Sequence, residues 1–208
     1  MPKIAVVGSK GGVGKTTLAV NLMGGLTQYG SVVLLDSDPQ QSALQWSVIR
    51  NQDDGPEVVD ASQTLRTKVR EWEAERNHVI IDCPPTVNAP QTLEALQVAD
   101  IAIVPVQPSP LDLWAMVHIV ETIEVAMESN QRLHALMVIN QLESRTLLSR
   151  FAHLAVRELQ LAVASTVIRR RAIYRTSMLE GRTVYQMGKR GVPAAKEITQ
   201  LIDEVIQR

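Results

Sequence analysis

The chain has 208 residues and a formal net charge of −1, and 45% of its residues are hydrophobic while only 3% are aromatic. This length suits one α/β domain, expected to span residues 1–208, and the single cysteine excludes a disulfide framework and any four-cysteine metal site. The N-terminus shows no secretory signal pattern, and no apolar run approaches the length of a membrane span. The sequence therefore predicts a cytoplasmic protein.

Short β-branched strands alternate with helix-length stretches along the chain. We expect strands at Lys3–Val7, Val32–Asp36, Val79–Asp82, Ile101–Val106 and Leu136–Asn140, with a weaker one at Val163–Ile168. Helices are expected at about 16–29, 40–50, 62–75, 91–97, 112–128, 146–158, 172–179 and 193–207. Near-continuous apolar strands joined by helices predict an α/β fold with a doubly wound, mostly parallel sheet and helices on both faces. In such a sheet, ligands bind at the carboxyl ends of the strands.

A glycine-rich turn at Gly8–Thr17 joins the first strand to the first helix. A phosphate-binding P-loop requires this context, because glycines let backbone N–H groups converge on an anion at the helix N-terminus. Lys15 is expected to reach the β- and γ-phosphates, and the Thr16 hydroxyl to ligate Mg²⁺. The residues expected to bind the nucleotide are Gly11, Gly12, Val13, Gly14, Lys15, Thr16 and Thr17.

This turn departs from the ordinary P-loop pattern, which would have glycine where the chain has Ser9. The pattern that fits is Lys-Gly-Gly-x-Gly-Lys-Thr, in which Lys10 belongs to the motif. Two alternatives stay open from the residues alone. The turn can be a tight loop without a ligand, and Lys10 can be a surface lysine beside an anion site.

Two carboxylates, Asp36 and Asp38, follow the second strand, and Pro39 ends it. Because Asp38 enters a loop, the two carboxylates can take different roles. Asp38 is a candidate to orient or activate the water that attacks a γ-phosphate, and Asp36 is a candidate to organise the Mg²⁺ shell. The alternative is that both cap the following helix around Gln41.

The next apolar strand ends in Asp82-Cys83-Pro84-Pro85. An apolar strand that ends in aspartate is a Walker B pattern, so Asp82 is expected to contact Mg²⁺ through water. The two prolines stiffen a turn that could register the γ-phosphate. Cys83 is interpreted as a small filler rather than a nucleophile, because no helix start or basic neighbour would lower its pKa.

Two further strand ends carry polar residues. Asn140 closes a strand, and its amide could pair with the edge of adenine; guanine-specific proteins use Asn-Lys-x-Asp, whereas this chain has Asn140-Gln141-Leu142-Glu143. The alternative is that Asn140 only forms a turn. In the loop before the long helix, Asp112 is expected to be the N-cap, with Pro110 excluding an earlier start.

Together these motifs resemble the ParA/MinD family of deviant-Walker P-loop ATPases over essentially the whole chain. The chain looks most similar to short ParA partition ATPases, which have no DNA-reading domain before the P-loop. We expect none here, since the P-loop begins at residue 8. The residues that carry the resemblance, in chain order, are Lys10, Lys15, Asp36–Gln40, Asp82–Pro85, Gln107–Asp112 and Asn140.

The resemblance implies a slow ATPase that uses ATP and Mg²⁺ and forms an ATP-sandwich homodimer. By position, Lys10 would reach the partner's nucleotide, Asp38 would serve hydrolysis, and Asp82 would be the Walker B residue. Family dimers bind nucleoid DNA without sequence preference, and a cargo-bound partner such as a ParB-like adaptor stimulates hydrolysis. A lysine supplied only on dimerisation would couple hydrolysis to assembly.

A basic stretch at residues 163–190 has seven basic residues against one acidic residue, a local excess of six positive charges. The sequence predicts that this surface contacts the DNA backbone, without the aromatic residues that stack on bases. The alternative is a solvated face that balances acidic helices. The residues expected to contact DNA are Arg169, Arg170, Arg171, Arg175, Lys189 and Arg190.

Two other functions compete with this one. A membrane-bound role like that of MinD would need a basic amphipathic C-terminal helix, but residues 193–208 include Glu197, Asp203 and Glu204, so we expect this helix to pack on the core. A metabolic amide synthase on the same scaffold would need a substrate domain or a glutamine-hydrolysing nucleophile. The cargo stays open between a plasmid, a chromosome and a protein body such as a carboxysome.

Overall fold

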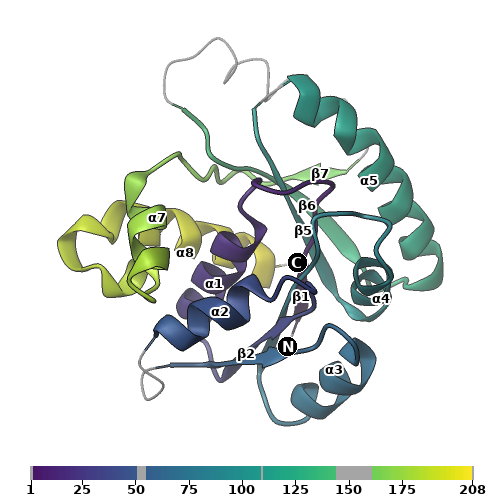
Figure 1. The fold of residues 1–208 in the computed structure, drawn as a ribbon. Coiled ribbons are helices and arrows are strands. Elements are labelled where there is room, and N and C mark those ends of the chain that lie inside the picture. Colours follow the sequence, from purple (N-terminus) through teal and green to yellow (C-terminus); the bar gives the residue numbers. More distant parts are fainter. Residues whose placement is uncertain (1, 51–54, 109, 144–160, 208) are drawn as a thin grey trace.

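The computed structural model describes residues 2–50, 55–108, 110–143 and 161–207, and within them the strands form one parallel sheet (Figure 1). The strand order is β3-β2-β4-β1-β5-β6-β7. The strands are β1 (Lys3–Val6), β2 (Val32–Asp36), β3 (Glu57–Asp60), β4 (His78–Asp82), β5 (Ile101–Val106), β6 (His134–Ile139) and β7 (Ala162–Val163). The predicted doubly wound parallel sheet is confirmed.

The observed helices follow the predicted ones within a few residues. They are α1 (Lys15–Leu26), α2 (Ser42–Ile49), α3 (Leu65–Glu73), α4 (Pro90–Val98), α5 (Pro110–Ser129), α7 (Ala172–Leu179) and α8 (Val192–Ile206), with short 3₁₀ turns η1 (Val184–Gln186) and η2 (Gly188–Arg190). The helix predicted at 146–158 lies outside the described residues.

Three details of the prediction were wrong. The strand predicted at Val163–Ile168 is observed only at Ala162–Val163, as β7. The edge strand β3 was missed, because Glu57-Val58-Val59-Asp60 holds only two apolar residues between acidic ones and gives no clear strand pattern. Helix α5 begins at Pro110, so Asp112 lies in its first turn and is not the N-cap. Proline is favoured in the first turn because its missing N–H would have no partner inside the helix.

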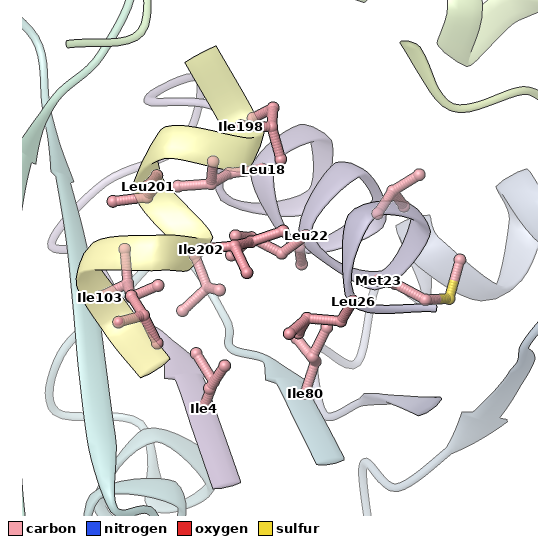
Figure 2. Packing of buried hydrophobic residues seen from close by; sticks show 14 of the residues in the cluster. Ile4, Leu18, Leu22, Met23, Leu26, Ile80, Ile103, Ile198, Leu201 and Ile202 are labelled. Carbon is pink, nitrogen blue, oxygen red and sulfur yellow. The ribbon is translucent and has the colours of Figure 1, made fainter. Parts of the chain in front are cut away.

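The strands bury both faces of the sheet, and their side chains alternate between two apolar clusters. Helices α1, α2, α7 and α8 pack on one face with Ile4 and Ile103, and α3, α4 and α5 pack on the other with Ala5 and Val104. Figure 2 shows Leu22 of α1 beside Ile202 of α8, in the cluster that includes Ile4 and Ile103 of the sheet. The apolar face of α8 is thus buried in the core, as predicted.

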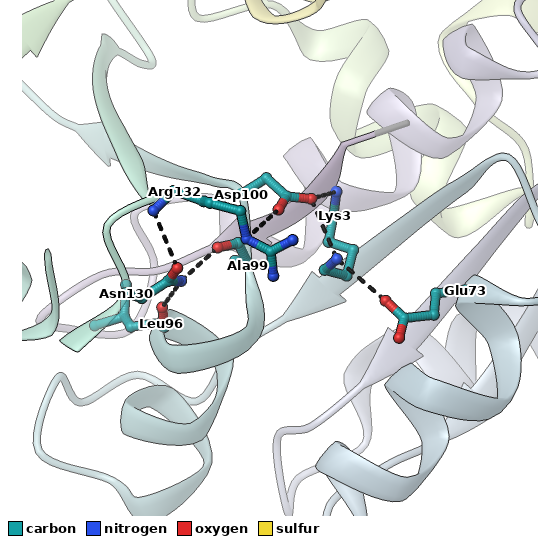
Figure 3. A network of polar contacts seen from close by, with 7 residues as sticks. All are labelled: Lys3, Glu73, Leu96, Ala99, Asp100, Asn130 and Arg132. Atoms are coloured by element: carbon teal, nitrogen blue, oxygen red, sulfur yellow. Dashed lines mark hydrogen bonds and ion pairs between the residues drawn. The ribbon is translucent and has the colours of Figure 1, made fainter.

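The amino ends of the central strands are closed by a polar network (Figure 3). Asp100 accepts a hydrogen bond from the backbone N–H of Lys3 at 2.8 Å, and the Lys3 ammonium lies 3.4 Å from Asp100 and 3.1 Å from Glu73. Asn130 donates to the carbonyls of Leu96 and Ala99 at 2.9 and 2.7 Å. These contacts hold the amino ends of the central strands in place. The sequence motifs lie at the opposite end of the sheet, at the carboxyl ends of the strands.

Candidate nucleotide site

The turn between β1 and α1 has the backbone geometry of an anion-binding loop. Gly12 and Gly14 have φ angles of 79° and 91°, in the left-handed region that favours glycine. A Cβ atom at Gly14 would lie 2.7 Å from Nδ2 of Asn140, so only glycine fits there. Helix α1 begins at Lys15, directly after Gly14, and its N-terminal N–H groups face the same space as the loop.

Side-chain amides from the ends of β5 and β6 hold two consecutive carbonyls of this loop. Gln107 and Gln141 each donate from Nε2 to the Gly12 carbonyl at 2.9 Å. Asn140 donates from Nδ2 to the Val13 carbonyl at 2.7 Å. The side-chain amides bind carbonyl groups of the loop. The backbone N–H groups of the loop therefore stay available to bind an anion.

Asn140 is the residue whose predicted role changes most in the structure. It lines a cavity beside the P-loop and the segment that leads into α7, as a residue that recognises adenine would. Its amide nitrogen, however, donates to Val13, and its amide oxygen accepts the N–H of Gln141 at 3.0 Å. Asn140 therefore positions the P-loop, and recognition of adenine by its amide stays a prediction.

Lys15 and Asp82 face each other below the loop. Lys15 is 7% exposed, and its ammonium donates to the backbone carbonyl of Lys10 at 3.1 Å. Burial lowers the pKa of Lys15, and the charge of Asp82 is the largest effect that opposes this shift. Asp82 is fully buried at the end of β4, and neither carboxylate oxygen has a hydrogen-bond partner among the described residues.

The surroundings of Asp82 fit a hydrated magnesium ion. Burial raises the pKa of Asp82 to about 7, with Asp36 adding to the shift and Thr16 and Lys15 opposing it. A buried carboxylate without a partner is costly, and a divalent cation would stabilise its charged form. Mg²⁺ keeps several waters and takes one or two protein ligands beside phosphate oxygens. Asp82 and Thr16 are the residues that would hold it here, beside the phosphates.

Asp36 and Asp38 have different surroundings. The Asp36 carboxylate accepts the N–H groups of Asp38 at 3.2 Å and Leu44 at 2.9 Å, one on each oxygen. Asp36 thus binds the start of α2 and the loop that carries Asp38, as in the capping alternative, and a role in the Mg²⁺ shell stays a prediction. Asp38 is half-buried, accepts the N–H of Gln40 at 2.9 Å and lines the larger cavity.

Cys83, next to Asp82, has the filler role that was expected. It is 1% exposed, and burial raises the pKa of its thiol far above the ordinary value. A thiol that stays protonated is not a nucleophile.

A larger and a smaller cavity, both lined by described residues, adjoin the P-loop. The larger, of about 760 Å³, is lined by Lys15, Thr16, Asp38 and Pro85, and it opens past α2 and α7. The smaller, of about 270 Å³, lies between the P-loop, Asn140 and the segment that leads into α7. The residues that line both are Gly12, Gly14, Thr17, Gln141 and Arg175. This arrangement suits phosphates in the larger cavity and a base in the smaller one.

Five of the seven basic residues of this stretch lie in two groups of neighbouring residues. Residues 169–171 come directly before α7 and line the smaller cavity. Arg171 donates to Glu197 of α8 at 2.6 and 3.1 Å, Arg169 lies 3.7 Å from the same carboxylate, and Arg170 pairs with Glu143. Acidic residues outside the stretch therefore offset part of its positive charge.

The second group in the basic stretch is Lys189 and Arg190, both exposed on the 3₁₀ turn η2. Neither residue makes an ion pair with a residue in the part of the chain that the structure describes. Among the residues predicted to contact DNA, these two therefore have exposed side chains that no described acidic residue neutralises.

In protein free of nucleotide and Mg²⁺, Asp82→Asn is expected to raise the unfolding temperature at pH 8. Because the folded pKa of about 7 lies above the ordinary 3.8, the folded state favours the protonated acid. That contribution to stability is complete below the unfolded pKa and is lost as the pH rises through 7. Above that pH the unpaired carboxylate destabilises the fold, at about 1.4 kcal/mol for each pKa unit, and asparagine removes the charge.

Thermal unfolding in a chelator at pH 5 to 8 measures this effect. The advantage of Asp82→Asn should shrink as the pH falls, and the variant should lose Mg²⁺-dependent nucleotide binding. An advantage that does not change with pH would show that the carboxylate is not buried with a raised pKa.

A strand, a glycine-rich turn and a helix, with a buried aspartate on the adjacent parallel strand, define a P-loop nucleotide-binding protein. Residues 4–184 match the family model described as the CobQ/CobB/MinD/ParA nucleotide binding domain, and the chain belongs to this family. Among the described residues, none of the helices combines the length and apolar character that crossing a bilayer requires.

Known proteins are similar to the chain along nearly its whole length. "Maintenance of carboxysome distribution protein A" of Halothiobacillus neapolitanus is 39% identical, with 98% of this chain and 95% of that protein covered. "Chromosome-partitioning ATPase Soj" of Thermus thermophilus is 30% identical, with 99% and 96% covered. The solved ATP complex of Cyanothece McdA has the same fold, with a TM-score of 0.75 at 16% identity, 100% of this chain and 96% of that one covered.

Proposed function

We propose that this chain is a ParA-type ATPase that spaces carboxysomes in the cell. The observation that carries the proposal is its 39% identity, along 98% of the chain, with a protein named for the maintenance of carboxysome distribution. ATP and Mg²⁺ occupy the site, the ATP-bound chain forms a homodimer on nucleoid DNA, and an adaptor on the cargo stimulates hydrolysis. Release from DNA then follows each round of hydrolysis.

Within one subunit, the site supplies most of the groups that phosphoryl transfer needs. Lys15 and the N–H groups of the P-loop bind the phosphates, and Asp82 and Thr16 hold Mg²⁺. Asp38, at the wall of the larger cavity, orients the attacking water. This proposal keeps Asp36 as the residue that positions Asp38, because backbone N–H groups already bind both of its oxygens.

Lys10 supplies positive charge to the partner's nucleotide. In support, Lys15 lines the larger cavity, whereas Lys10 is not among the residues that line either of these two cavities. The Lys10 backbone carbonyl accepts a hydrogen bond from the Lys15 ammonium. The Lys10 ammonium reaches the phosphates only when two subunits form a dimer, so hydrolysis depends on dimerisation.

DNA binding is proposed to use the exposed pair Lys189 and Arg190, with the arginines at 169–171 adding positive charge nearby in the sequence. Two copies of the surface in one dimer double the number of phosphate contacts, and such contacts carry no sequence information. The similarity to Soj, at 30% identity over 99% of the chain, supports a chromosome or plasmid as the second candidate cargo.

Imaging of carboxysomes in the host cell tests the proposal. With the gene intact, labelled carboxysomes should be evenly spaced along the nucleoid; with the gene deleted, or with Lys189→Glu and Arg190→Glu combined, they should cluster. In vitro, the double variant should bind DNA of any sequence about 10-fold more weakly or worse at low salt, with a smaller salt dependence.

The control is Arg66→Glu with Arg70→Glu, which makes the same charge change on the exposed side of α3, across the sheet. This variant should keep both DNA binding and even spacing. Carboxysomes that stay evenly spaced in the deletion strain, while plasmids or chromosomes are lost, would move the proposal to the second cargo.

A further inference from the structure

Arg175 of α7 stands where the two nucleotide cavities meet. Of the five residues that line both cavities, it is the only one with a charged side chain. The other residues at this junction belong to the P-loop, the start of α1 and the Gln141 turn. A cation thus faces the P-loop from the opposite side, across the passage between the phosphate space and the base space.

Arg175 differs from the other arginines of the basic stretch in its partners. Arg171 and Arg170 are bound to Glu197 and Glu143, and Arg182 lies 3.4 Å from Glu180. The Arg175 guanidinium makes no hydrogen bond or ion pair with any residue that the structure describes. Its exposed guanidinium is therefore available to a ligand in the cavities without breaking an existing pair.

A nucleotide that occupies both cavities would have its α-phosphate at this junction. With the β- and γ-phosphates on Lys15 and the P-loop in the larger cavity, and the base in the smaller one, the α-phosphate and the ribose lie between them. A guanidinium binds a phosphate through two parallel hydrogen bonds, which are stronger than bonds to the neutral ribose hydroxyls.

We propose that Arg175 binds the α-phosphate of the nucleotide, rather than the DNA backbone as the sequence predicted. This inference rests on the proposal that ATP occupies the site. Because ADP and ATP share the α-phosphate, the contact stabilises both nucleotides equally and is the same before and after hydrolysis. Arg175 is thus a nucleotide-affinity residue, without a part in the chemical step.

The test compares the affinities of Arg175→Gln and its parent for Mg-ADP and Mg-ATP, by titration calorimetry without DNA. Loss of a charge-assisted bond should weaken both affinities by the same factor, about 10- to 100-fold. In turnover assays KM should rise by a similar factor while kcat at saturating ATP stays unchanged. Arg182→Gln, which removes an exposed arginine outside both cavities, is the control and should change neither affinity.

Different results would separate the ways in which the inference can fail. Unchanged affinity for both nucleotides would overturn it, and a loss confined to ATP would assign Arg175 to the γ-phosphate instead. A parent that binds neither nucleotide would refute the proposed function itself. If Arg175→Gln unfolds, Arg175→Lys replaces it: the charge remains but the paired bonds are lost, so a smaller, equal loss for ADP and ATP is expected.

Discussion

Lys10→Ala is expected to abolish partner-stimulated ATP hydrolysis while the isolated subunit still binds nucleotide. Lys15 and the P-loop N–H groups, which carry binding within one subunit, are untouched, and the Lys10 backbone carbonyl that holds Lys15 is kept by alanine. What is lost is positive charge at the transferring phosphate, which is worth about 100-fold or more in rate.

Hydrolysis of ATP with and without DNA and the adaptor measures this effect, and calorimetry measures nucleotide affinity. The matched control is Lys196→Ala, which removes an exposed lysine from α8 and should leave both quantities unchanged. Full stimulated turnover in Lys10→Ala would exclude a role for Lys10 in hydrolysis.

Asp38→Ala should give dimers that bind ATP and stay on DNA without hydrolysing it. Asp38 lines the phosphate cavity beside Lys15 and Thr16, so its carboxylate is placed to orient the attacking water. Loss of a group that positions or accepts a proton costs about 10²- to 10⁴-fold in rate. Binding of Mg-ATP should change little, because Asp82 and Thr16 remain.

The measurement is the time for which the protein stays bound to DNA after free ATP is removed. Glu57→Ala, which removes an exposed carboxylate at the amino end of β3, is the control and should dissociate at the parent's rate. An Asp38→Ala variant that turns over ATP normally would exclude Asp38 from the mechanism.

The sequence was sufficient to predict the sheet and the P-loop, because both depend on local patterns. Continuous apolar strands identify a buried parallel sheet, and the spacing of Gly12, Gly14 and Lys15 identifies the anion site. Asp82 could be predicted because it ends an apolar strand in a chain that already has a P-loop. Each of these signals lies within a few residues.

The contacts that shape the site were not predictable, because they join residues far apart in the chain. Gln107 and Gln141 meet on the Gly12 carbonyl from 95 and 129 residues away, and glutamines after a strand carry no local signal for this role. Glu197 of α8 binds Arg171 across 26 residues, so the basic stretch seemed more highly charged in the sequence than it is in the fold. The hydrogen bond from the Leu44 N–H to Asp36 at the start of α2 could not be predicted, because it depends on how the chain folds between these two residues.

Mixing two inactive variants tests whether Lys10 acts on the nucleotide of the other subunit. In a mixed dimer of Lys10→Ala and Asp38→Ala, one site has its own Asp38 and receives Lys10 from the partner. With equal amounts and random pairing, half of the dimers are mixed and each has one complete site. Because one site in two is complete in half of the dimers, we expect about a quarter of the parent's stimulated ATPase activity. If Lys10 acts within its own subunit, neither site of a mixed dimer is complete. A mixture as inactive as its two components would therefore show that Lys10 does not act on the nucleotide of the other subunit.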